Sequence, residues 1–224
     1  MTRLDLWLVQ NKHFSSRQAA KRAIHQGLVT IDGVKAKPST QVSGTEGIEV
    51  SDTALNFPIG YSKLEFLHRT VSHLITPQTQ ALDIGSSAGG FLRYLAENCS
   101  HVTGIEISDE FMDALQEITQ QHDTVSVLID NAFALDPSII SQQSTLDLLL
   151  IDVTTGLEGT IKLIEKYSSL LVSEGWLVAA FKAVPSPNII SDIVNKVENL
   201  EFHDVKGIVI QVSRKEFHVV GRRH

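Results

Sequence analysis

A glycine-rich segment carries the clearest chemical signal in this 224-residue chain. It spans residues 82–91, with the sequence LDIGSSAGGF. Glycines let the backbone approach a ligand closely, and a helix that begins there offers free N–H donors. A dinucleotide-binding loop would have the spacing G-x-G-x-x-G to hold a pyrophosphate, whereas these glycines follow G-x-x-x-G-G. Asp83 lies just before them, where a carboxylate would repel pyrophosphate but could pair with a cationic amino-acid group.

Acidic side chains also end the next three strand-like segments. Glu106, which lies 21 residues after Gly85, suits the two hydroxyls of a ribose. Asp130 with Asn131 ends the third segment and could reach an adenine amino group, and Asp152 ends the fourth. Doubly wound sheets bind their ligands at this carboxyl edge. The set predicts a nucleoside with a cationic amino-acid tail and no phosphates, which describes S-adenosylmethionine.

The residues expected to bind this cofactor come from the loop and from the ends of the following strands. They are Asp83, Gly85, Ser86, Ser87, Gly89, Gly90, Phe91, Glu106, Ile107, Asp130, Asn131, Ala132 and Asp152. The glycine loop taken alone has another interpretation, a tight turn between a strand and a helix. The recurrence of acidic residues at one edge favours the cofactor.

An alternation of strands and helices must position these residues. Apolar segments predict strands over 81–85, 101–107, 124–130, 146–153 and 175–182, with helical patterns between most of them. Such alternation indicates a parallel sheet covered on both faces. Segments 204–210 and 215–221 predict an antiparallel hairpin at the end. The expected fold is α/β, a Rossmann-like class I methyltransferase fold with a mostly parallel sheet, and its first helix carries Leu64, Leu67, Val71 and Leu74.

The first fifty residues predict a separate small α+β domain. One helix carries Leu4, Trp7 and Leu8, and a second begins at Ser15 or Ser16 and ends at Gly27. A hairpin centred on Asp32-Gly33 and a strand over 47–50 follow. The domains are therefore 1–50, a linker over 51–60 that contains Pro58 and Gly60, and 61–224.

Charge divides the chain in the same place. The net charge is −7, yet residues 1–50 hold seven basic and four acidic side chains, while the rest hold twelve and twenty-two. Because phosphate attraction is local, a basic patch on an acidic protein can bind RNA. The candidate RNA-binding residues are Arg3, Lys12, Arg17, Lys21, Arg22 and Lys35. The alternative is that these charges only solvate a helix face.

Residues 63–224 resemble the FtsJ-type RNA ribose methyltransferases. The resemblance rests on DIGSSAGGF at the loop, LLLIDV before Asp152, WLVAAFK ending in Lys182, and SRKEFHVV around Glu216. It implies a Lys–Asp–Lys–Glu tetrad formed here by Lys63, Asp152, Lys182 and Glu216. By this resemblance Lys182 is the base, oriented by Asp152, while Lys63 and Glu216 position the ribose. A lowered lysine pKa, helped by the second lysine, would suit that role.

Residues 1–50 resemble the RNA-binding domain named for ribosomal small-subunit protein four, through RLDLWLV, SSRQAAKRAI and QGLVTIDG. The two domains in this order resemble the TlyA (haemolysin-like) family of ribosomal RNA 2′-O-methyltransferases. The resemblance implies ribosomal RNA or a ribosomal subunit as partner. The chain departs from that family after Asp152, with Val153-Thr154-Thr155-Gly156, and after Lys182, with Ala183-Val184-Pro185-Ser186-Pro187, so the target nucleotide can differ.

Three other functions remain open at this stage. The chain could be a non-catalytic RNA-binding protein on a methyltransferase scaffold, or a methyltransferase for small molecules or proteins. Membrane lysis is suggested only by the family label, and no segment combines a large apolar face with a cationic one. The longest apolar run, 176–181, is too short to span a bilayer, and Cys99 is the only cysteine. We therefore expect a cytoplasmic protein without a metal site or disulfide.

Overall fold

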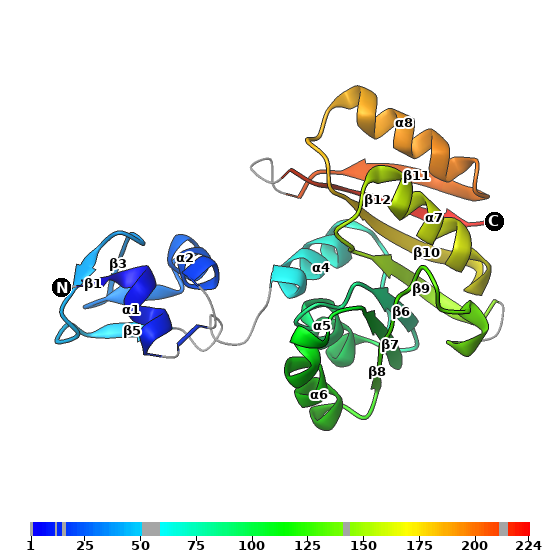
Figure 1. The fold of residues 1–224 in the computed structure, drawn as a ribbon. Helices are drawn as coiled ribbons and strands as arrows, with labels where there is room; N and C mark the ends of the chain where they lie inside the picture. The colour runs from blue at the N-terminus through cyan, green and yellow to red at the C-terminus, as the bar shows by residue number, and fades with distance from the viewer. Residues whose placement is uncertain (1, 12, 15–16, 51–58, 141–143, 211–214) are drawn as a thin grey trace. The chain divides into compact units, whose positions relative to one another are not determined.

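The computed structural model describes residues 2–11, 13–14, 17–50, 59–140, 144–210 and 215–224 (Figure 1). The chain divides into two compact units between Phe57 and Pro58. Each unit has its own apolar core and is described by itself.

The smaller unit packs two helices against short antiparallel strands. The helices are α1 (Leu4–Gln10) and α2 (Arg17–His25), and β2 (Val29–Ile31) pairs with both β3 (Val34–Lys35) and β5 (Ile48–Val50). A further pair, β1 (Thr2–Arg3) with β4 (Gln41–Val42), was not anticipated. The predicted hairpin is confirmed, because Asp32 and Gly33 connect β2 to β3 with φ values of 50° and 76°.

A seven-stranded sheet forms the centre of the larger unit. Its spatial order is β11-β12-β10-β9-β6-β7-β8. The strands from β6 to β10 run parallel, and β12 is antiparallel to both of its neighbours, as the sequence predicts. The bounds are β6 (Gln80–Ile84), β7 (His101–Glu106), β8 (Val125–Ile129), β9 (Leu146–Ile151), β10 (Leu171–Phe181), β11 (Phe202–Ile208) and β12 (Phe217–Arg223).

Helices cover both faces of this sheet, so the predicted Rossmann-like fold is confirmed (Figure 1). Apolar residues of α4 (Ile59–Thr70), α5 (Gly90–Asn98) and α6 (Met112–Gln121) pack on one face. Those of α7 (Leu157–Tyr167) and α8 (Pro187–Glu198) pack on the other. Short 3-10 turns at Asp109–Phe111, Pro137–Ile139 and Ser168–Leu170 complete the described elements.

The boundaries of four elements differ from the sequence prediction. Helix α4 begins at Ile59 and ends at Thr70, so Ile59 and Gly60 belong to it rather than to the linker, Lys63 is its fifth residue, and Leu74 lies beyond it. The other eight linker residues, 51–58, lie outside the described part. Strands β11 and β12 begin two residues away from their predicted positions, and β10 begins four residues earlier, across a register shift.

Candidate active site

Four side chains from distant parts of the chain form a closed ring of ion pairs. Lys63 Nζ lies 2.9 Å from Asp152 Oδ2 and 3.0 Å from Glu216 Oε1. Lys182 Nζ lies 2.8 Å from Glu216 Oε2 and donates a short hydrogen bond to Asp152 Oδ1. The structure thus brings together all four residues of the expected tetrad. Each lysine is held by both carboxylates.

The order of the strands explains why the ring closes. Asp152 directly follows β9, Lys182 directly follows β10, and Glu216 directly precedes β12, and these three strands are neighbours. Phe181 pairs with Phe217 in the register of β10 and β12, which sets Lys182 and Glu216 level with each other. Lys63 belongs to α4, which packs on the face of the sheet that also carries α5 and α6, and its side chain reaches Asp152 and Glu216 from there.

The carboxylates of the ring are held ionised. Burial alone would raise the pKa of Glu216, but the two lysines outweigh it and lower that pKa to about 2. The pKa of Asp152 is lowered for the same reason, against the same effect of burial. The ring therefore carries two positive and two negative charges at neutral pH.

Lys182 differs from the expectation in one respect. Burial favours its neutral form, but Asp152 and Glu216 outweigh burial, so its pKa is raised rather than lowered. The expected lowering by the second lysine is not seen, because hydrogen bonds and charge attraction from both carboxylates raise the pKa of Lys182. Lys182 is also the most accessible member of the ring, with a side chain 25% exposed against 9% for Lys63. It is the lysine that a substrate can reach.

The glycine loop lies between β6 and α5 and is fixed by protein contacts at several points. Gly85 and Gly89 have φ values of 91° and 78°, which side chains rarely adopt. A Cβ on Gly85 would lie 2.7 Å from the carbonyl oxygen of Asp152, and one on Gly89 would lie 2.1 Å from Ile118. These glycines are therefore needed for packing within the protein. In the sequence, their spacing predicts the close approach of a ligand or a tight turn, but not this packing.

Glu106 holds the same loop from β7. Its Oε2 accepts a hydrogen bond of 2.7 Å from the Ser87 N–H, and its Oε1 accepts one of 2.9 Å from the Ser108 N–H. The carboxylate is buried beside the loop, and each oxygen keeps a second lone pair. Glu106 can thus order the loop and still accept a hydroxyl.

Asp83 is the most unusual charged group near the loop. Its side chain is 0% exposed, and neither carboxylate oxygen has a hydrogen-bond partner of good geometry among the described residues. Burial raises its pKa to about 7. The Ser86 side chain offsets only part of this effect. A buried carboxyl is costly when ionised, so a nearby cation would stabilise its charged form.

The remaining expected cofactor residues lie around the ends of β6, β7 and β8. Ser86 and Phe91 are buried in and after the loop, whereas Ile107 is 67% exposed directly after Glu106. Asp130 Oδ1 accepts the Asn131 N–H at 2.6 Å, Asn131 Oδ1 accepts the Phe133 N–H at 2.9 Å, and Ala132 is buried. Exposed Ile107 and Phe133 add apolar surface to this edge, and Phe133 was not anticipated.

Comparison with known proteins identifies both parts of the chain. Residues 60–224 match the model of the FtsJ-like methyltransferase family, and residues 2–48 match the model of the S4 domain. The chain belongs to the FtsJ-like methyltransferase family. It is a methyltransferase that carries an S4 domain at its N-terminal side. No curated protein matches the sequence.

Solved structures share the fold of the FtsJ-like domain. A protein from Streptococcus thermophilus that carries the name hemolysin has a TM-score of 0.62 and 20% identity, covering 99% of this chain and 88% of its own. The fibrillarin pre-rRNA processing protein of Methanococcus jannaschii has a TM-score of 0.61 and 19% identity, covering 87% and 88%. Aeropyrum pernix fibrillarin with natively bound S-adenosyl-L-methionine has a TM-score of 0.58 and 14% identity, covering 86% and 87%.

In the S4 domain, three of the predicted RNA-binding residues surround one buried carboxylate. Asp5 is 0% exposed, and it accepts hydrogen bonds from Arg3 Nε at 3.0 Å and Arg17 Nη2 at 2.9 Å, with Lys21 Nζ at 3.8 Å. The guanidinium of Arg3 is the main reason that the pKa of Asp5 is lowered to about 2. Nothing in the spacing of the acidic residues singled out Asp5, whereas the shared helix face of Arg17 and Lys21 was predictable.

Two further predicted RNA-binding residues lie on α2 and β3. Arg22 lies half-buried on α2, and Lys35 is exposed on β3. Lys12 falls outside the described residues. The S4 domain therefore presents at least three organised cations, with net charge +2 once Asp5 is counted.

His218 is a second buried group that the sequence did not reveal. It lies on β12, two residues after Glu216, and its side chain is 1% exposed. Burial is the main cause and the nearby Lys63 the second cause that lower the pKa of His218 to about 4, so its imidazole is neutral at neutral pH. A histidine in an alternating strand pattern gives no sign that it faces the core.

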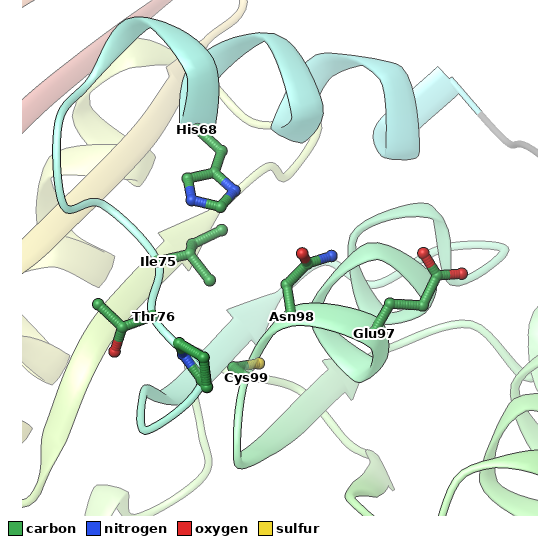
Figure 2. A pocket seen from close by; sticks show the side chains of 7 residues that line it. His68, Ile75, Thr76, Glu97, Asn98 and Cys99 are labelled. Atoms are coloured by element: carbon green, nitrogen blue, oxygen red, sulfur yellow. The ribbon is translucent and has the colours of Figure 1, made fainter.

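A hollow of about 220 Å³ lies between α4, α5 and the chain before β6, away from the ion-pair ring (Figure 2). It is lined by His68, Ile75, Thr76, Pro77, Glu97, Asn98 and Cys99. Burial raises the pKa of the Cys99 thiol to about 12, which argues against a nucleophilic role. No helix in the described ranges is long and apolar enough to cross a membrane, and no group of metal-ligating residues occurs among them.

Proposed function

We propose that this protein transfers a methyl group from S-adenosylmethionine to a ribose 2′-hydroxyl of RNA, with ribosomal RNA as the substrate class. The closed ring of Lys63, Asp152, Lys182 and Glu216 carries the proposal. Two of its members, Asp152 and Lys182, follow the carboxyl ends of parallel strands, and the backbone of Asp152 lies against the start of the glycine loop. Doubly wound sheets bind their ligands at this edge.

The residues around the loop fit the proposed cofactor. The orphaned carboxyl of Asp83 would be stabilised in its charged form by the cationic amino-acid end of the ligand. Because Asp83 is fully buried, that cation would act across the loop. The lone pairs left on Glu106 suit ribose hydroxyls, and Ile107 with Phe133 offers apolar surface to a base. Asp130 and Asn131 supply polar groups beside that surface.

The ring would prepare the hydroxyl for an in-line displacement. When bound, the cofactor supplies a methyl group on a positively charged sulfur, and the new O–C bond forms as the S–C bond breaks. Lys182, the accessible lysine, would accept the hydroxyl proton in its neutral form. Asp152 and Glu216 fix the Lys182 amine, and Lys63 balances their charge and holds both carboxylates in place. Alignment of the oxygen is the main contribution expected of such a site.

The S4 domain supports an RNA substrate. Its three cations around Asp5 retain exposed surface, with side chains between 42% and 48% exposed. Guanidinium groups bind phosphate oxygens well, and exposed cations steer RNA to the protein. One of the similar structures, the Methanococcus jannaschii fibrillarin, is a pre-rRNA processing protein, and this favours ribosomal RNA over other acceptors.

The decisive experiment measures transfer of radiolabelled methyl from S-adenosylmethionine to total ribosomal RNA and to ribosomal subunits. Lys182→Ala is compared with the wild type and with Lys196→Ala. Lys196 is a matched control because it also pairs with two carboxylates, Glu158 and Asp192, but on the surface of α8. We expect label in ribose-methylated nucleosides, a loss of at least a hundredfold in Lys182→Ala, and no change in Lys196→Ala.

Three results would contradict the proposal. Cofactor binding without transfer to any RNA would point to another methyl acceptor, such as a protein or a small molecule. Absence of cofactor binding by calorimetry would instead favour an RNA-binding protein on an inactive scaffold. Label in a base rather than in the ribose would disprove the 2′-hydroxyl alone.

A further inference from the structure

Two glycines from different helices touch backbone to backbone beside the active site. Gly60 lies in the first turn of α4, and Gly90 is the first residue of α5. A Cβ on Gly90 would lie 2.8 Å from Gly60 Cα, and a Cβ on Gly60 would lie 3.1 Å from Gly90 Cα. Neither glycine has a positive φ. Their lack of a side chain is therefore explained by this contact and not by their backbone conformation.

Side chains bridge the two helices beyond this contact. The Tyr61 hydroxyl donates a 2.6 Å hydrogen bond to Glu97, and the Tyr61 ring packs edge-on against Tyr94 at 4.9 Å. His68 Nδ1 lies 2.8 Å from the Tyr94 hydroxyl. His68 of α4 and Glu97 and Asn98 of α5 also line the hollow of Figure 2. The glycine contact thus lies at one end of the helix pair, and the hollow lies at the other.

This end of the helix pair lies between the cofactor loop and the ion-pair ring. Lys63 follows Gly60 by three residues, which is about one helical turn. Gly90 ends the loop, while Gly85 at its start abuts the carbonyl oxygen of Asp152. Both ends of the loop therefore contact backbone that carries a member of the ring, Asp152 directly and Lys63 one turn away.

We propose that Gly60 and Gly90 are positioning residues, which set Lys63 at a fixed distance from the glycine loop and hence from the methyl donor. The proposal rests on the proposed function for its catalytic meaning, but the position of Lys63 can be tested without activity. A side chain at either glycine forces the helices apart by a few tenths of an ångström or more, because backbone atoms cannot rotate away.

Gly60→Ala tests the contact, and Ser62→Ala is its control. Both changes raise intrinsic helix propensity, so a loss of function in Gly60→Ala cannot come from a weaker helix. Ser62 is exposed on the same helix. We expect kcat for methyl transfer to fall at least tenfold in Gly60→Ala, because small misplacements of reacting groups are costly. The Kd for S-adenosylmethionine should stay within threefold, and Ser62→Ala should match the wild type in both.

Lysine labelling followed by mass spectrometry gives a readout independent of activity. Lys63 is 9% exposed and ion-paired, so it should acetylate slowly, whereas Lys196 on the surface serves as an internal reference. We expect labelling of Lys63 to rise at least threefold in Gly60→Ala with Lys196 unchanged. Unchanged labelling together with unchanged kcat would overturn the proposal. A wild type that transfers no methyl group would disprove the proposed function but leave the labelling result decisive for the contact.

A second variant keeps the test decidable if Gly60→Ala does not fold. Tyr61→Phe removes the hydrogen bond to Glu97 and leaves the glycine contact intact. The proposal expects its kcat within threefold of the wild type and its Lys63 labelling unchanged. A tenfold loss of kcat in Tyr61→Phe would show that the side-chain bridge positions Lys63, and the glycine contact would lose its assigned role.

Discussion

The charge state of Lys182 decides how the proposed site can work. Its two carboxylate partners raise its pKa, so the neutral amine that accepts a proton is the minor form at pH 7. The positive sulfur of the proposed cofactor would oppose this effect. If Lys182 is the base, methyl transfer should therefore be slow at neutral pH and faster in alkali. If Lys182 acts only as a cation that orients the hydroxyl, the rate should not depend on its neutral form.

The rate of methyl transfer in a single turnover should rise about tenfold per pH unit between pH 7 and 9. Below its pKa, the neutral fraction of a base grows in this proportion. Asp152 and Glu216 have lowered pKa values and stay ionised throughout, so they add no slope. A flat profile at saturating cofactor and RNA would contradict a base role and leave Lys182 as a positioning cation.

Asp83 should couple cofactor binding to proton release. Its pKa of about 7 leaves it largely protonated at pH 6, and a cationic ligand across the loop would lower that pKa. We expect up to one proton released per S-adenosylmethionine bound at pH 6, and affinity that rises from pH 5 to 8. Calorimetry in two buffers of different ionisation enthalpy measures the release. Asp83→Asn should abolish it.

Stability without cofactor should show the opposite dependence on pH. The folded state holds the Asp83 proton more tightly than the unfolded state, whose pKa is 3.8, so folding loses stability as pH rises from about 4 to 7. The loss is at most about 4 kcal/mol for a pKa that rises from 3.8 to about 7. Asp83→Asn should flatten this part of the stability curve, as followed by urea unfolding. An unaltered curve would show that Asp83 is not the group responsible.

At the scale of elements, two stacked phenylalanine side chains align the end of β10 with the start of β12, where two members of the ion-pair ring lie. Phe181 precedes Lys182, Phe217 follows Glu216, and their side chains stack with centroids 5.4 Å apart on the opposite face of the sheet. This contact joins β10 to β12 next to Lys182 and Glu216 of the ion-pair ring. The same apolar pair thus contributes both to the core and to the geometry of the site.

Phe217→Leu should reduce both stability and turnover. The smaller side chain removes part of the stack, and we expect a loss of roughly 1–2 kcal/mol, below the 3–5 kcal/mol typical of truncation to alanine. Phe202→Leu on β11 is the matched control, because Phe202 is equally buried but lies at the other end of β12, beside Arg223. Urea unfolding should show similar losses for both, and kcat should fall only in Phe217→Leu.

Element order and strand direction could be predicted from the sequence, whereas several boundaries could not. Alternating apolar segments identified every strand of the larger sheet and its antiparallel end. The start of α4 was missed because Pro58 and Gly60 resemble a linker, and only the contact with Gly90 shows why a glycine stands inside a helix. The tetrad residues were predictable from their flanks, but the buried partners Asp5 and His218 were not, because burial depends on contacts far apart in the chain.

At the scale of the whole molecule, local geometry and net charge give opposite predictions for RNA binding. Asp5 is the only acidic residue in the described cluster around Arg3, Arg17 and Lys21, so its removal makes the S4 domain more basic. A simple count of charges would then predict tighter binding. We expect weaker binding instead, because Asp5 holds the guanidinium groups in one arrangement.

Asp5→Asn should weaken RNA binding by about three- to tenfold, within the range that a typical intramolecular hydrogen bond contributes. Filter binding at several salt concentrations measures it. Glu49→Gln is the control, since it removes one negative charge from an exposed position of β5 in the same domain. Tighter binding by both variants would show that net charge, not arrangement, controls affinity. Thermal melting of each variant checks that the domain remains folded.

The order in which the chain is made sets when the enzyme can become active. Lys63 and Glu216 pair across 153 residues, and β12, which follows Glu216, lies between β10 and β11 in the sheet. During synthesis, the S4 domain, the glycine loop and both lysines emerge before the last carboxylate does. A nascent chain could thus bind RNA before it could methylate it. The emergence of Glu216 and β12 would separate a period of recognition from the onset of catalysis.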